Sequence, residues 1–163
     1  MSALYTFLDL ASCGYCLGST TWYFFVASPI AFKILGREKF VPTMMGQARV
    51  YFMHMSGALA ASLGLSLANG ASHSSTAVLS AGVGLAAALT NQLVVGPSAL
   101  AAGKASLTDA ETEKTNKMKD FVSEGGGHRT KFWHRMVVVV VLTMTAANAL
   151  HVWGIASRVA PPT

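Results

Sequence analysis

Residues 136–156 read MVVVVVLTMTAANALHVWGIA, a run without a single Asp, Glu, Lys or Arg. An α-helix rises about 1.5 Å per residue, and about 20 apolar residues are needed to cross the hydrocarbon core of a bilayer. The run is long enough for one crossing. The sequence therefore predicts a transmembrane helix over these residues.

Three further segments, 6–32, 43–68 and 76–95, are about as long and as apolar, with charges near their ends. The 163-residue chain is 52% hydrophobic and only 12% charged, whereas an average soluble domain is about 25% charged. We therefore expect an all-α protein, a four-helix transmembrane bundle in which residues 1–163 form a single integral membrane domain.

The third helix should end near Gly96 and Pro97, because proline lacks a backbone donor and disfavours helix in the residue before it. The segment 98–130 then forms a polar loop between the third and fourth helices. Capping-box spacing at its centre predicts a short amphipathic surface helix over 109–122, and the glycines at 125–127 should end that helix.

The basic residues are distributed unequally about these four helices. Of the 12 Lys and Arg residues, every one except Arg158 falls on the side of the two loops that join helices 1 and 2 and helices 3 and 4. By the positive-inside rule, those loops face the cytoplasm or the mitochondrial matrix. We expect a mitochondrial inner-membrane protein with both termini in the intermembrane space. Lys33 is the first base, so we expect no signal peptide and retention of the first helix.

Five polar or basic residues are predicted to share the level of these basic loops: Arg49, His54, Asn91, His134 and Arg135. Basic pockets at this depth can hold anionic phospholipid headgroups, so these residues are candidates for lipid or anion binding. The alternative is that they bond one another and hold the helices together. Because the bases flank membrane segments, anionic lipids are the expected counterparts, and nucleic acid is not.

Small residues recur along the predicted helices. In lipid, small residues let helix backbones approach closely. The glycines expected at such helix contacts are Gly14, Gly18, Gly57, Gly64 and Gly82.

Candidates for redox, haem or proton chemistry are weak. Cys13 and Cys16 have dithiol spacing, but they lie inside an apolar helix, where packing is the expected role. A haem needs two axial ligands at one depth, and only His54 and His134 share a leaflet.

Two ionisable residues lie elsewhere in the predicted helices. His151 is expected to bond a neighbouring helix together with Asn148. Asp9 is expected to be an interfacial carboxylate near the outer face.

Three short motifs resemble the four-helix membrane proteins similar to transmembrane protein 205, a domain of unknown function. They are Tyr51, Phe52, His54 and Ser56; Asn91 followed by Pro97; and Phe132, Trp133 and His134. The resemblance spans Trp22 to Gly154 and implies a four-helix membrane fold. This chain has Gly96 where the family usually carries an acid.

No nucleophile and base motif, phosphate loop or metal-ligand spacing occurs in the chain, so we expect no enzyme, no metal and no cofactor beyond a bound anionic phospholipid. The first hypothesis is a structural or accessory subunit that binds other membrane subunits of a multisubunit complex, preferably a respiratory-chain or ATP synthase complex. The alternative is a small transporter or lipid-binding protein that uses the Arg49, His54 and His134 pocket.

Overall fold

A computed structural model of the chain describes residues 3–70, 75–114 and 126–159. The described residues are almost entirely helical and contain no strand. The elements are α1 (Ala3–Thr21), η1 (Trp22–Ala27), α2 (Ser28–Ala68), α3 (Thr76–Thr90), η2 (Asn91–Val95), α4 (Gly96–Lys114) and α5 (Gly126–Val159), where η denotes a π-helix. The prediction of an all-α protein is confirmed.

Within these described ranges, three helical stretches are long and apolar enough to cross a membrane: Gly46–Ala68, Thr76–Ala105 and Lys131–Ser157. Stretches of this kind indicate an integral membrane protein. Large apolar side chains such as Leu79, Leu93, Leu142 and Trp153 are exposed on them, which suits a surface in contact with lipid.

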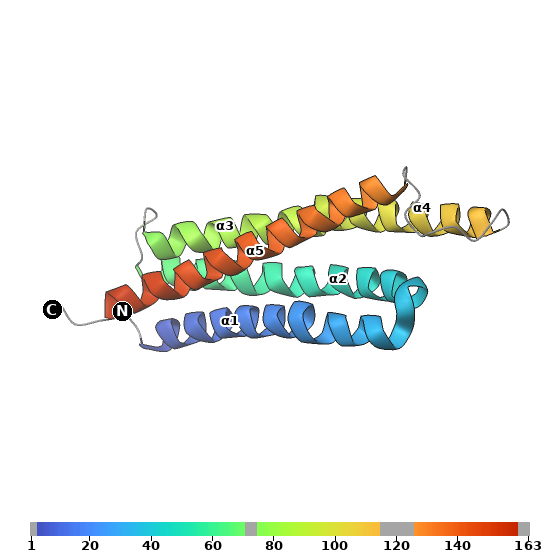
Figure 1. Cartoon of the computed structure of the whole chain (residues 1–163). Helices are drawn as coiled ribbons and strands as arrows, with labels where there is room; N and C mark the ends of the chain where they lie inside the picture. Colours follow the sequence, from blue (N-terminus) through green and yellow to red (C-terminus); the bar gives the residue numbers. More distant parts are fainter. Residues whose placement is uncertain (1–2, 71–74, 115–125, 160–163) are drawn as a thin grey trace.

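The helices lie side by side along one long axis (Figure 1). α5 packs along α3 in the most extensive helix contact, and α1 packs along α2 and also touches α5. The start of α1, the end of α2, the start of α3 and the end of α5 lie at one end of the molecule, and α4 extends past the other end (Figure 1).

The turn between the first two long helical arms is tighter than predicted. Gly36 has non-helical backbone angles (φ 65°, ψ 167°), a positive φ that glycine adopts without a steric cost. The chain reverses its direction between the two arms, at the right of the view (Figure 1). Helix therefore extends on both sides through 33–42, where the sequence predicted a loop.

The predicted end of the third helix at Gly96 and Pro97 is wrong, because helix continues into α4. The π-helix η2 precedes the proline, and the Gly96 N–H donates to the carbonyl of Asn91, five residues back. Such a widened turn accommodates a proline that would otherwise disrupt the i to i−4 ladder. η1 precedes Pro29 in the same way, with the Ser28 N–H donating to the Tyr23 carbonyl.

The polar loop predicted over 98–130 is also largely helical where it is described. Its first part belongs to α4, and α5 already begins at Gly126, ten residues before the predicted start at 136. Gly126 and Gly127 therefore lie within a helix and do not end one. The surface helix predicted over 109–122 overlaps the end of α4 only to Lys114, and 115–122 lie outside the described residues.

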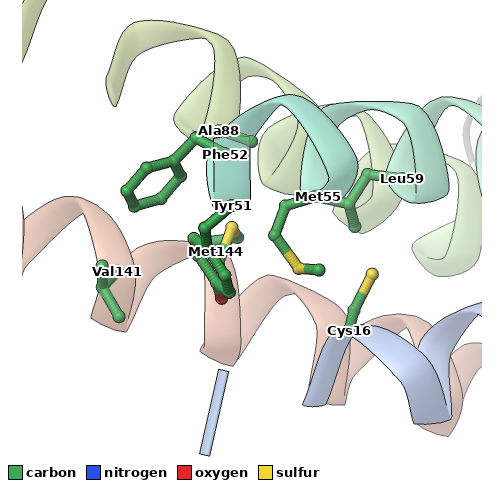
Figure 2. Close-up of a cluster of buried hydrophobic side chains, with 8 residues drawn as sticks. All are labelled: Cys16, Tyr51, Phe52, Met55, Leu59, Ala88, Val141 and Met144. Atoms are coloured by element: carbon green, nitrogen blue, oxygen red, sulfur yellow. The ribbon is translucent and has the colours of Figure 1, made fainter. Parts of the chain in front are cut away.

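The main apolar core lies between α1, α2, α3 and α5. Its buried side chains, shown in Figure 2, are Cys16, Tyr51, Phe52, Met55, Leu59, Ala88, Val141 and Met144. Tyr23 stacks on Tyr51 with ring centroids 4.8 Å apart, and Phe24 meets Tyr51 edge-on at 5.5 Å. The π-helix η1 thus contributes two of the aromatic rings that close this core.

The glycines predicted at helix contacts make no close contact with another helix among the described residues of this chain. A Cβ added at Gly14, Gly18, Gly57, Gly64 or Gly82 would meet no atom within 4 Å outside its own helix backbone. The close approach is instead at Gly154, where an added Cβ would lie 2.8 Å from the Ala77 nitrogen. Periodicity alone identified small residues, but it did not identify which of them face a neighbour.

Candidate functional site

The five residues predicted to form a basic pocket do not share one environment. Arg49, His54, His134 and Arg135 are all exposed, and Asn91 is fully buried. His54 therefore points away from the core that receives Asn91. Among the described residues, neither polar atom of the Asn91 side chain has a hydrogen-bond partner, so Asn91 does not bond His54.

A different group of polar residues is buried at the opposite end of the molecule. Asp9 on α1 is 3% exposed and His151 on α5 is 1% exposed. His151 Nε2 lies 2.9 Å from Asp9 Oδ1. We call Asp9, Cys13, Ser66, Asn148 and His151 the Asp9 cluster.

Both nitrogens of the His151 ring have defined partners. Nδ1 lies 2.6 Å from the carbonyl oxygen of Ala77 on α3, and a carbonyl only accepts, so Nδ1 carries a proton and donates it. One further proton lies between Nε2 and the Asp9 carboxyl group, because an uncharged nitrogen and an ionised carboxylate cannot bond each other without it. The ring is therefore fixed from two sides.

The second carboxyl oxygen of Asp9 also has a partner. The Ser66 hydroxyl on α2 donates to Asp9 Oδ2 at 2.7 Å. Through Asp9 and His151, the hydrogen bonds of this group connect α1, α2, α3 and α5. Such pairing is what makes a carboxyl group tolerable away from water.

Cys13 and Asn148 lie beside this pair. The Asn148 Nδ2 donates to the backbone carbonyl of Cys13 at 3.1 Å, and Cys13 Sγ lies 3.8 Å from the Ser62 hydroxyl. Asn148 is 2% exposed, and its Oδ1 is buried without a hydrogen-bond partner. The cluster therefore contains a thiol and a free amide oxygen as well as the Asp9 and His151 pair.

Polar pairs continue from the cluster along the contact between α1 and α2. Towards the end of the molecule at which α1 begins, Asn69 Nδ2 donates to the Thr6 hydroxyl at 3.1 Å. In the other direction, the hydroxyl groups of Thr20 and Tyr51 lie 2.6 Å apart. With Asp9–Ser66 and Cys13–Ser62, these pairs form a polar seam between the two helices.

Sequence reasoning missed the Asp9 cluster, although the sequence contained a signal for it. The prediction that His151 and Asn148 bond neighbouring helices holds, but Asp9 is a buried partner and not an interfacial carboxylate. When consecutive helices run in alternate directions, one end of the bundle contains the start of the first helix, the end of the second, the start of the third and the end of the last. Asp9, Ser66, Ala77 and His151 occupy those places in turn.

Comparison with known proteins identifies a family. A family model described as a domain of unknown function (DUF4149) matches residues 11–106, more than half of the chain. No curated protein and no solved structure matches the chain. The matched range contains Cys13, Ser66 and Ala77, while Asp9 and His151 lie outside it.

Proposed function

We propose that this chain, which belongs to the DUF4149 family of unknown function, crosses the membrane four times and acts as a non-catalytic accessory subunit of a larger membrane complex. The observation that carries the proposal is the placement of small residues on α1 and α2. Gly14, Gly18, Gly57 and Gly64 are all exposed.

Small residues promote helix association in lipid because they let two backbones come close enough for extensive van der Waals contact. The four exposed glycines have no such contact within the described part of the chain, since no atom outside their own helix backbone lies within 4 Å of a Cβ added at any of them. Helices of neighbouring subunits are the partners that would use these positions.

The fourth crossing is assigned to the arm that runs through α1 and η1 into the start of α2. Large apolar side chains are exposed along this arm: Leu4, Phe7, Trp22, Phe25 and Ile30. Its one charged residue before Lys33 is Asp9, which is buried against His151. An arm with an apolar exterior and an internally paired charge is suited to lipid.

The orientation follows from the positive-inside rule and places both termini on the side away from the basic residues. For a mitochondrial inner-membrane protein that side is the intermembrane space, and an energy-converting complex is the preferred host. Labelling of single cysteines introduced at Lys39 and Ser2 tests the orientation. The proposal expects modification from opposite sides, and modification of both from one side would refute the four crossings.

The subunit role is tested by mild solubilisation of the native membrane followed by a non-denaturing gel. We expect the chain to migrate with a large complex, and Gly18→Leu to release it because the added side chain separates the backbones. Ala86→Leu is the matched control, since Ala86 is exposed on α3 and the substitution places the same final side chain there. Migration of the unaltered chain at monomer or dimer size would refute the subunit role.

The second candidate function is a small transporter or lipid-binding protein. Exposed Arg49 and Arg135 favour it, because each base near an anionic membrane surface contributes about 1 kcal/mol of attraction. Native mass spectrometry of the purified chain tests it. We expect a bound anionic phospholipid that is lost in the double variant Arg49→Gln, Arg135→Gln, and equal lipid retention in both proteins would remove this candidate.

A further inference from the structure

We propose that Asp9, Cys13 and His151 bind one divalent transition-metal ion of the Zn²⁺ class. Each residue offers one ligand atom, and the carboxyl oxygen, the thiol sulfur and the imidazole nitrogen all lie within 4.8 Å of one another. The three residues are buried at the same end of the helices. The site is independent of the proposed subunit role.

The spacing suits a tetrahedral ion. Zn²⁺ binds nitrogen and oxygen at about 2.0–2.2 Å and thiolate sulfur at about 2.3 Å, which places neighbouring ligand atoms about 3.3–3.8 Å apart in a tetrahedron. Asp9 Oδ1 and His151 Nε2 are 2.9 Å apart, so they separate slightly when an ion replaces the proton between them. The sulfur is already within reach.

The groups around the three ligands are those that orient metal ligands in proteins. A ligating histidine usually donates its other ring N–H to a carbonyl or carboxylate, and a ligating carboxylate is itself hydrogen-bonded. Here the His151 Nδ1–H donates to the Ala77 carbonyl at 2.6 Å. The Ser66 hydroxyl donates a hydrogen bond to Asp9 Oδ2 at 2.7 Å.

A second observation points to a ligand at the same place. Asn148 lies one turn before His151 on α5, and its amide is held beside Cys13 by the bond from Nδ2 to the Cys13 carbonyl. The Asn148 Oδ1 is buried without a partner, which is costly unless something satisfies it. A metal ion, or a water molecule bound to it, is a partner for this oxygen.

Charge balance selects a divalent ion. Binding removes the thiol proton of Cys13 and the proton shared by Asp9 and His151, so two protons leave for each ion. A thiolate, a carboxylate, a neutral imidazole and a divalent ion then have a net charge of zero. A neutral group is far less costly to bury than a charged one, whereas a monovalent ion would leave one uncompensated negative charge.

The test uses the full-length protein in detergent, reduced and stripped of metal, with Co²⁺ as a spectroscopic probe for Zn²⁺. We expect one Co²⁺ per chain, a sulfur-to-cobalt charge-transfer band, and release of two protons per ion in weak buffer. Excess Zn²⁺ should abolish the band by competition. Absence of the band, or release of no protons on binding, would overturn the proposal.

Two cysteine variants form a matched pair for this test. Cys13→Ser should lose the charge-transfer band, and Cys16→Ser should retain it, because Cys16 is equally buried but packs in the apolar core. Ser66→Ala should lower the affinity about 10- to 100-fold, as is usual for a residue that orients a ligand. A band that persists in Cys13→Ser would refute the site. If Cys13→Ser does not fold, retention of the band in Cys16→Ser with release of two protons still supports it.

Discussion

The two ends of the molecule differ in how their polar residues are used. At the end formed by Asp9, Ser66, Ala77, His151 and Gly154, which we call the Asp9 end, the side chains of Asp9, Ser66 and His151 each have a partner on another helix. The opposite end, which we call the basic end, contains the residues that the sequence marked as a pocket: Arg49, His54, Asn91, His134 and Arg135. Four of these are exposed, and Asn91 is buried with no partner.

The comparison teaches that a shared depth in the membrane does not by itself make a site. Polar groups form a site when their side chains also point towards one another, since an isolated buried polar group is costly. At the Asp9 end the side chains do so, whereas at the basic end four of the five side chains are exposed and only Asn91 is buried.

The largest change in the free energy of unfolding is expected at the contact between α3 and α5 at the Asp9 end. Gly154→Leu should lower the free energy of unfolding by about 3 kcal/mol or more, because the side chain would collide with the backbone of Ala77 and overpacking of this kind is strongly destabilising. Chemical unfolding in mixed micelles measures it. Gly18→Leu is the control and should unfold like the unaltered protein, since no atom lies near its added Cβ. Equal losses in both variants would contradict the assignment of this contact.

A smaller loss is expected from the hydroxyl group that supports Asp9. Ser66→Ala should cost about 1 kcal/mol, which is typical of a hydrogen bond between membrane helices. The control is Thr143→Ala, because the Thr143 hydroxyl bonds its own helix at an exposed position. The same unfolding measurement applies, and a Ser66→Ala protein as stable as Thr143→Ala would show that the bond contributes nothing.

At the basic end, replacing the buried residue Asn91 should change the free energy of unfolding in the opposite direction. Asn91→Leu should raise the free energy of unfolding by about 1 kcal/mol, because it removes a buried amide that has no partner and whose burial is costly. Asn148→Leu should instead lower it, since Asn148 bonds the Cys13 carbonyl. A loss of stability in Asn91→Leu would mean that the amide has a favourable role at this end.

The smallest effect is expected at His54. His54→Leu should change the free energy of unfolding by less than about 0.5 kcal/mol, as is usual for exposed substitutions. Thermal unfolding beside the unaltered protein measures the difference. A clear loss would contradict the exposed position of His54 and indicate that its side chain has a partner.

The length and apolar character of the helices could be predicted from the sequence because both depend on composition over many residues. The segments 43–68, 76–95 and 136–156 all lie inside observed helices. The helix ends were harder to predict. Proline was expected to end the third helix, but the π-helix η2 widens the turn before Pro97 and lets helix continue.

Which side chains meet in the candidate site depends on the rotation of each helix about its axis. The sequence did not determine these rotations. A rotation of half a turn exchanges the buried and exposed faces, so the sequence did not show that His54 and the four glycines of α1 and α2 are exposed. Of His54, His134 and Asn91, only Asn91 faces the core. For Asp9, the missing information was that His151 from the far end of the chain faces it.

The central claim is that the pair formed by Asp9 and His151 joins α1 to α5, and a double-mutant cycle tests it most directly. Asp9→Leu and His151→Leu should each lower the free energy of unfolding by about 3 kcal/mol, because each leaves one buried ionisable group without its partner. The double variant should lose about 2 kcal/mol less than the sum of the two single losses, since residues in contact are coupled. Losses that add to within about 0.5 kcal/mol, as for distant and independent sites, would contradict the claim.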